Sequence, residues 1–199
     1  AEVQVGTALH AITEKETYTK VEHDITLTAN DKKVTFIDVP VRIPNEASIA
    51  FTAHAKYSVT VVLENKAGDR YKVIIGAEHN RFLQIERNGT VVYQLLTDLL
   101  PMARLSEDTP TDYWVSIFGG TIMLGQGKIG DNLFMAWQDR DLLNNITKLG
   151  FQPGDHDQKF SNIEIAPAVT IGIANEPITN EEQFNRKPYA GSMTLYRPF

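Results

Sequence analysis

The segment FLQIERNGTVVYQL, residues 82–95, contains the pattern that decides the fold class. Two runs rich in β-branched and aromatic residues flank the dipeptide Asn88-Gly89. Asn and Gly both accept the positive φ angles of a type I′ turn, whose twist matches that of the adjoining strands. The segment therefore predicts a β-hairpin.

The same pattern recurs along the chain. In YWVSIFGGTIMLG, residues 113–125, the dipeptide Gly119-Gly120 separates two strand-like runs, and residues 66–69 (KAGD) separate VTVVLE from RYKVII. Pro101 interrupts the apolar segment DLLPMARL, so at most one helical turn is expected there. Further short runs, most of them alternating apolar and polar residues, occupy residues 18–28, 33–43, 48–54, 134–138, 147–151, 162–165, 169–173 and 192–196.

Roughly a dozen short strands spaced about 8–12 residues apart are typical of an antiparallel sandwich. We therefore predict an all-β fold, an antiparallel β-sandwich of the jelly-roll or lectin-like kind with few or no helices. Trp114 and Trp137 lie in strand-like runs, where tryptophan is more often a core residue than a ligand platform. Neighbouring side chains in a strand face opposite sides, so Tyr113 or Trp114 is expected to be the less buried of that pair.

Composition limits the function classes. The 199 residues suit one domain, and the hydrophobic (42%) and charged (22%) fractions are those of an ordinary globular protein. The net charge of −6 argues against a general nucleic-acid partner, and no apolar run approaches the ~18 residues of a membrane span. The absence of cysteine excludes disulfides, zinc–thiolate sites and a thiol nucleophile.

Two features favour an extracellular location. The sequence starts at Ala1 rather than Met, which fits a removed signal peptide, a trimmed chain or a lost initiator Met. Sequons for N-glycosylation occur at Asn88 and Asn145, although such tripeptides also arise by chance. We therefore expect a secreted protein.

Sequence motifs of catalysis are missing. The glycine clusters Gly119-Gly120 and GQGKIG (residues 125–130) adjoin predicted strands, whereas dinucleotide or methyl-donor sites usually need a following helix. Neither a P-loop, an HExxH motif nor a G-x-S-x-G elbow occurs. Paired-carboxylate glycosidase chemistry is not tested by sequence spacing, because its two residues can lie far apart in the chain. We expect no enzyme and no cofactor.

One loop has the composition of a sugar-binding site. Glu78, His79, Asn80 and Arg81 follow the apolar strand YKVIIG. Planar polar groups bind hydroxyls, and a nearby aromatic ring covers the C–H side of a sugar. The alternative is an ordinary polar hairpin loop.

A second polar loop, Gly154-Asp155-His156-Asp157, offers partners for the first. Asp155 and Asp157 could supply oxygen ligands to Ca²⁺ if distant loops completed the six to eight ligands required. The alternative is an exposed polar turn. The five histidines are scattered, so they define no metal site.

The central part of the chain resembles a known family. The segments FTA (51–53), YKVIIG (71–76) with Asn80, Ile85 and Arg87 after it, YWVSIFGGTIMLG, FMAWQD (134–139) and Gly150-Phe151 are similar to the domain named after farnesoic acid O-methyltransferase. The resemblance covers residues 48–165. It implies a β-sandwich that serves as a binding module, with no recognisable methyl-donor motif and no catalytic residues to carry over.

The chain departs from that family at both polar loops. Relatives usually have Gly-Gly-Trp after the YKVIIG-type strand, whereas Gly76 is followed here by Ala77-Glu78-His79. The GDHDQ segment likewise replaces a stretch with glycine and tryptophan. Residues 1–47 and 166–199 have no recognised counterpart, and we expect them to add strands, an arm or an interface.

Several functions remain open. We favour a non-enzymatic, lectin-like carbohydrate-recognition protein that binds a glycan or other small ligand through Glu78–Arg81, Asp155 and Asp157, as a homo-oligomer for avidity. The alternatives are a self-assembling structural protein, a carrier of an apolar terpenoid or pigment, and a true methyltransferase.

Overall fold

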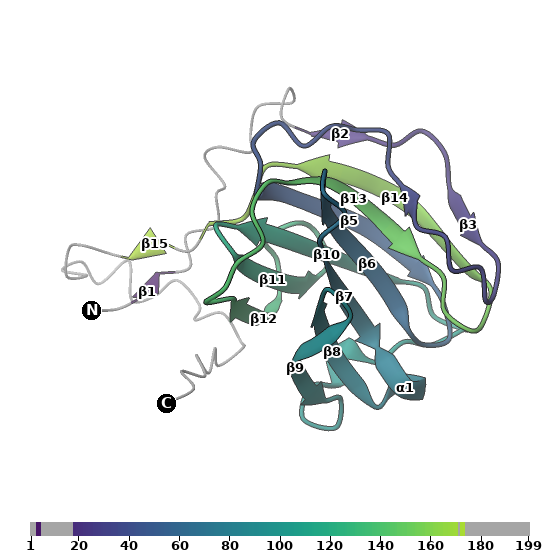
Figure 1. Ribbon diagram of the computed structural model, residues 1–199. Coiled ribbons are helices and arrows are strands. Elements are labelled where there is room, and N and C mark those ends of the chain that lie inside the picture. Colours follow the sequence, from purple (N-terminus) through teal and green to yellow (C-terminus); the bar gives the residue numbers. More distant parts are fainter. Residues whose placement is uncertain (1–2, 5–17, 171, 174–199) are drawn as a thin grey trace, which may run out of the picture.

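A computed structural model describes residues 3–4, 18–170 and 172–173. Two antiparallel sheets pack face to face, as Figure 1 shows, so the predicted β-sandwich is confirmed. The first sheet has the order β12 (Leu133–Gln138), β11 (Thr121–Gln126), β10 (Thr111–Phe118), β5 (Glu46–His54), β14 (Gln158–Ala166) and β2 (Thr19–Lys20), with β3 (Ile25–Leu27) also paired to β14.

The second sheet contains the predicted hairpins. Its order is β4 (Thr35–Phe36), β13 (Ile146–Gln152), β6 (Val59–Asn65), β7 (Arg70–Gly76), β8 (Phe82–Arg87) and β9 (Thr90–Leu96). Outside the two sheets, β1 (Val3–Gln4) pairs with β15 (Gly172–Ile173), and the helical elements described are a four-residue turn, α1 (Ala77–Asn80), and a 3-10 turn, η2 (Pro101–Ala103).

The predicted turn chemistry is observed. Asn88 and Gly89 have φ angles of 49° and 83° between β8 and β9, and Gly119 and Gly120 have 52° and 85° between β10 and β11. Each pair therefore adopts the two positive φ angles expected of a type I′ turn. Gly68, in the connection from β6 to β7, also has a positive φ.

The core between the sheets is centred on three phenylalanines. Phe151 of the second sheet stacks on Phe160 of the first, with ring centroids 4.0 Å apart, and Phe51 meets both rings edge-on. All three are at most 2% exposed. These rings join β5, β13 and β14, so the packing links both sheets near the candidate site described below.

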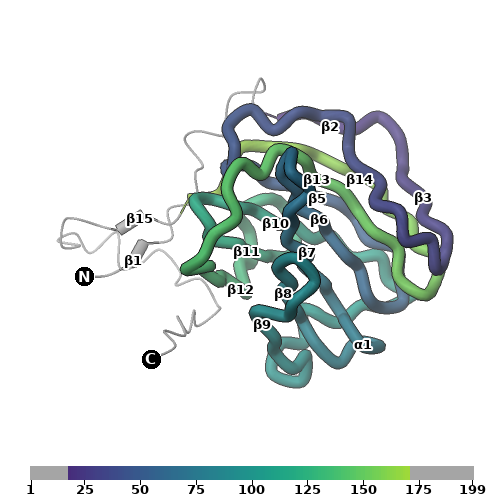
Figure 2. The backbone as a smooth tube through the Cα atoms, in the orientation of Figure 1, coloured from purple at the N-terminus to yellow at the C-terminus, as the bar shows by residue number. Residues whose placement is uncertain are grey.

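Strands near the N-terminus are shorter than predicted. Of residues 33–43, only Thr35–Phe36 forms a strand, although the Ile37 amide still donates to the Leu149 carbonyl. Pro40 lacks an N–H and cannot extend this ladder. Figure 2 shows the N-terminal part of the described chain, in purple, running beside β14. Residues 18–47 thus contribute β2, β3 and β4 to the two sheets, whereas the predicted strand at 192–196 lies outside the described residues.

The expectation that Tyr113 or Trp114 would be less buried is wrong, because both are fully buried. Tyr113 faces the core, where burial raises its pKa to about 12 and its hydroxyl donates to the Met102 carbonyl. Trp114 faces outward, but its Nε1 donates to the Asp131 carbonyl at 2.7 Å and its ring packs on Met123 and Val169. Alternation predicts which face a side chain takes, but it does not predict what covers that face.

Gly125 provides a test of this packing. It lies opposite Trp114 on β11, and a Cβ there would overlap the indole ring. We expect Gly125→Ala to lower the free energy of unfolding by at least about 1–3 kcal/mol, the usual cost of overpacking. Chemical denaturation measures this, with Gly154→Ala as the control, because that glycine has no positive φ and its Cβ would approach no atom closer than 3.3 Å. A loss in Gly125→Ala no larger than that in Gly154→Ala would show that the overlap with Trp114 does not matter.

Among the described residues, the helical turns are too short to span a lipid bilayer.

Candidate functional site

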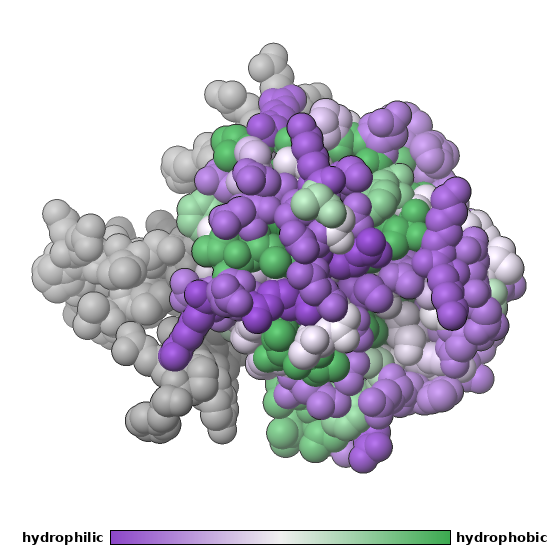
Figure 3. Space-filling view, viewed as in Figure 1, coloured by the Kyte–Doolittle hydropathy of each residue, from purple (hydrophilic) through white to green (hydrophobic). Residues whose placement is uncertain are grey.

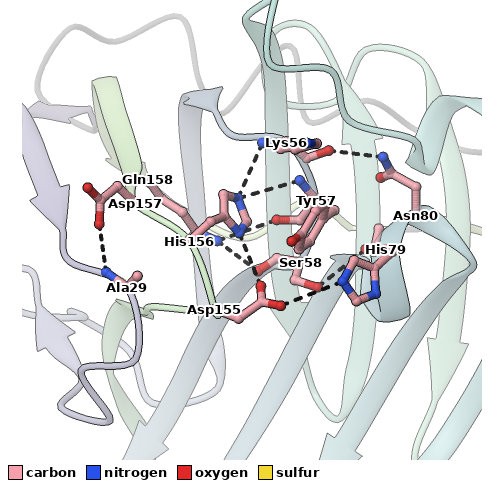
Figure 4. A network of polar contacts seen from close by, with 11 residues as sticks. Ala29, Lys56, Tyr57, Ser58, His79, Asn80, Asp155, His156, Asp157 and Gln158 are labelled. Atoms are coloured by element: carbon pink, nitrogen blue, oxygen red, sulfur yellow. Dashed lines mark hydrogen bonds and ion pairs between the residues drawn. The ribbon is translucent and has the colours of Figure 1, made fainter.

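Three loops meet at one end of the sandwich, as Figure 4 shows. They connect β5 to β6, β7 to β8 and β13 to β14. His79 Nε2 lies 3.7 Å from Asp155 Oδ2, so the two loops chosen from the sequence contact each other. We call this region the loop cluster, defined by Tyr57, His79, Asp155 and His156.

The loop cluster contains a row of three rings. The Tyr57 ring lies 4.4 Å from the His79 ring and 4.4 Å from the His156 ring, centroid to centroid. Tyr57 is half-buried, and the His79 side chain is 71% exposed. The row therefore presents an aromatic surface at the tip of the sandwich, anchored at its inner end.

His156 is that anchor. Its Nε2 accepts the Lys56 amide at 3.2 Å, so in the neutral ring the proton is on Nδ1. Nδ1 can then donate to Asp155 Oδ1, 3.3 Å away. Only 18% of the His156 side chain is exposed, which suits a positioning role.

Asp155 is kept ionised by its neighbours. Partial desolvation pushes its pKa upward, but the His156 hydrogen bond and the charges of His156 and His79 outweigh it, so the pKa is lowered. The carboxylate interactions are therefore fully present above the ordinary aspartate pKa and are lost as the pH falls through the lowered value. At neutral pH Asp155 offers a half-exposed acceptor beside the ring row.

The β7–β8 loop has an unusual backbone. Glu78, His79 and Asn80 have φ angles of 49°, 59° and 66°, so α1 is a left-handed turn. Left-handed conformations cost L-residues about 1–2 kcal/mol each, and such strain clusters at functional sites. This conformation brings His79 to Tyr57 and Asp155.

Asn80 maintains that turn. Its Nδ2 donates to the carbonyls of Lys56 and Leu105, each at 2.9 Å, and its Oδ1 accepts the Leu105 amide. The side chain predicted to bind ligand is thus used within the fold, and Asn80 is a scaffold residue.

The other predicted residues lie apart from the ring row. Glu78 and Arg81 form an exposed ion pair at 3.9 Å, and Arg81 lies over the Phe82 ring. Asp157 points away, as Figure 4 shows, and its Oδ1 accepts the Ala29 amide at 2.8 Å. Within residues 18–170, no three His, Asp or Glu side chains converge as a metal site. The structure therefore does not bring Asp155 and Asp157 together as a calcium pair.

Sequence reasoning missed Tyr57 as a site residue. It lies in the short connection between the predicted strands at 48–54 and 58–63. An aromatic residue in so short a connection at the end of the sandwich can indicate a binding surface, because its side chain is too far from the space between the sheets to pack in the core.

Comparisons with known proteins find a matching family model and a sequence relative. A family model described as "Farnesoic acid 0-methyl transferase" matches residues 18–163, which extends the resemblance thirty residues toward the N-terminus. The BTB/POZ domain-containing protein At2g30600 of Arabidopsis thaliana is 32% identical over 143 residues, 65% of this chain. The chain spans 17% of the length of that relative.

Solved structures with a similar fold come from A. japonicus and Aspergillus kawachii. "Crystal Structure of A. japonicus CB05" has a TM-score of 0.54 at 12% identity, covering 80% of this chain and 27% of that one. A fructosyltransferase from A. japonicus has a TM-score of 0.52 at 10% identity, covering 80% and 28%. A β-fructofuranosidase from Aspergillus kawachii has a TM-score of 0.51 at 11% identity, covering 77% and 28%. At these identities the likeness establishes the sandwich fold alone.

Proposed function

The chain belongs to the farnesoic acid O-methyltransferase family, and from that premise we propose that it is a non-enzymatic, lectin-like module that binds carbohydrate. The loop cluster at the end of the sandwich is the proposed binding surface. The observation that carries the proposal is the ring row with Asp155 beside it.

The loop cluster combines the two kinds of contact that a sugar needs. The exposed His79 ring and the edge of Tyr57 can cover the C–H face of a pyranose or furanose ring. The Asp155 carboxylate can accept hydrogen bonds from hydroxyl groups, and the rings' polar atoms add further donors or acceptors. The structural neighbours named for fructose chemistry support fructans as ligands to include in a screen.

We propose a binding role in spite of the family's name. Methyl-donor sites usually combine a strand, a glycine-rich turn and a helix N-terminus. The glycine pair Gly119-Gly120 lies in a hairpin between two strands, and α1 is a four-residue left-handed turn. Calorimetry with S-adenosylmethionine tests this directly, and heat at micromolar donor would overturn the non-enzymatic reading.

The proposed module acts outside the cell. Asn88 and Asn145, the acceptor residues of the two sequons, are both exposed. Glycosylation at either position would support secretion and is measured by mass spectrometry of the native protein.

Self-association is a second candidate, favoured by one edge of the second sheet. β9 is an edge strand on which Val91 is 46% and Leu96 42% exposed, and Leu99 just beyond it is 71% exposed. Figure 3 shows a mostly hydrophilic face with an apolar group toward this lower end. Light scattering would detect the oligomer, and Leu99→Lys should weaken it if this edge is the contact.

The test of carbohydrate binding is a glycan array that includes fructo-oligosaccharides, probed with labelled protein in calcium and in chelator. We expect the native chain to bind specific glycans and His79→Gly to bind them more weakly. Lys66→Ala, a substitution at an exposed residue of the β6–β7 hairpin, should bind like the native chain. If no glycan on the array binds, either with calcium or with chelator, the proposal is wrong.

A further inference from the structure

Beyond the loop cluster, we propose that the outer face of the first sheet holds a second, separate site that binds a neutral saccharide. A groove of about 550 Å³ runs across β2, β5, β10 and β14, beside the loop that follows β11. Ligand pockets in proteins span about 300–1,000 Å³, so the groove can hold more than one sugar ring. Its polar lining includes Tyr18, Lys20, Thr52, Asp112, Asn162 and Glu164.

The polar residues of the groove form an ordered chain across three strands. Thr52 pairs directly with Asp112 in the ladder between β5 and β10. The Thr52 hydroxyl donates to Asp112 Oδ1 at 2.5 Å and accepts from Asn162 Nδ2 at 3.1 Å. Thr52 is only 9% exposed, so it lies at the floor of the groove and holds the more exposed Asp112 carboxylate and Asn162 amide. A carboxylate has about four acceptor positions, so Asp112 keeps capacity for ligand hydroxyls.

An irregularity in β14 gives the groove its third wall. The register against β5 shifts between Ser161 and Glu164, and Asn162 has a φ of 50°. Bulges of this kind redirect side chains and are common beside binding sites. Here the bulge places Asn162 and Glu164 on the same groove lining.

Tyr18 adds an aromatic surface and a donor. Burial raises the pKa of its phenol, and the Glu164 carboxylate raises it further. The hydroxyl therefore remains protonated at neutral pH and can donate to a ligand. Its half-buried ring can cover an apolar sugar face, as the ring row does at the other site.

Charge favours a neutral ligand. Two carboxylates, Asp112 and Glu164, lie with two ammonium groups, Lys20 and Lys128, in one groove. A strongly anionic or cationic ligand would meet like charge on one wall, whereas hydroxyl groups find both donors and acceptors. A neutral saccharide, whose hydroxyl groups both donate and accept hydrogen bonds, is the ligand class that suits both the carboxylates and the ammonium groups.

Binding at the two sites is followed through the NMR signals of different histidines. His54 lies on β5 two residues from Thr52, with its Nε2 3.0 Å from the Ser161 hydroxyl, so its ring reports on the groove face. His79 and His156 report on the loop cluster. Imidazole NMR signals are followed while the protein is titrated with kestose, cellotriose and laminaritriose, and with a triuronate as the charged comparison.

We expect at least one neutral trisaccharide to shift the His54 signal saturably. The dissociation constant read from His54 should rise at least tenfold in Asp112→Asn and in Thr52→Val, and stay unchanged in His79→Gly. Asp108→Asn, an exposed carboxylate before β10, is the matched control. Circular dichroism establishes that the variants fold.

Three outcomes would overturn the inference. Shifts confined to His79 and His156 would leave the loop cluster as the site and remove the groove. The same dissociation constant at His54 in the native protein and in both groove variants would also remove the groove. A His54 response to the triuronate alone would remove it too. Conversely, a His54 response without any at His79 would retain the groove while removing the proposed function of the loop cluster.

Discussion

The variant Asp139→Ala is expected to lose about 2–4 kcal/mol of unfolding free energy, because the buried Tyr71 hydroxyl and the half-buried Arg87 guanidinium lose their acceptor. Arg87 Nη1 lies 3.1 Å from both Asp139 carboxylate oxygens. The Tyr71 hydroxyl donates to Asp139 Oδ2 at 2.7 Å, and burial raises the pKa of Tyr71 so that it stays protonated. The Asp139 side chain is 7% exposed and that of Arg87 26%.

The loss reaches beyond the pair itself. The Leu143 amide donates to the Tyr71 hydroxyl at 2.8 Å, and the Asp141 amide donates to Asp139 Oδ1. Removing the carboxylate therefore also releases the connection between β12 and β13.

The chain offers a matched control for this prediction. Asp141 makes its own 3.1 Å ion pair with Arg87, but its side chain is 89% exposed. Solvent screening limits such a pair to less than about 1 kcal/mol, so Asp141→Ala should be nearly neutral. Urea denaturation of both variants decides the point, and equal losses would show that burial of Asp139 does not matter.

The variant His79→Gly is expected to separate stability from binding. Glycine has no penalty at a φ of 59°, while its greater freedom in the unfolded chain offsets part of that gain. The free energy of unfolding should therefore stay unchanged or rise by up to about 1 kcal/mol. The same change removes the exposed ring of the ring row, so affinity for the array-selected glycan should fall at least tenfold, about 1.4 kcal/mol.

Two measurements check this variant. Thermal unfolding gives stability, and calorimetric titration with the selected glycan gives affinity. Asp155→Asn, which keeps the shape and removes the charge, should show the affinity loss without any gain in stability. If His79→Gly binds like the native chain, the left-handed turn serves the fold alone.

The parts of the fold that sequence predicted well are local. Asn88-Gly89 and Gly119-Gly120 define their hairpins through backbone preferences that need no distant contact. The expectation that Tyr113 or Trp114 would be the less buried residue failed, because the cover over Trp114 comes from Asp131 and Val169, which no alternation pattern connects to β10.

The candidate site was predictable only as two polar loops. That His79 meets Asp155 follows from the order β13-β6-β7, which places the ends of these strands together. Asn80 and Asp157 were chosen for their chemistry, but their backbone partners decide their use. The groove could not be predicted from the sequence, because its residues are far apart in the chain. Asp112 and Asn162 lie 60 and 110 residues after Thr52.

The most direct test of carbohydrate binding at the loop cluster is the imidazole NMR spectrum of the native chain, titrated with the glycan that binds most tightly on the array. If carbohydrate binds at the loop cluster, the His79 and His156 signals shift together along one saturable curve, while exposed His23, outside the cluster, does not respond. A glycan that binds with His79 and His156 unchanged would contradict binding at the loop cluster.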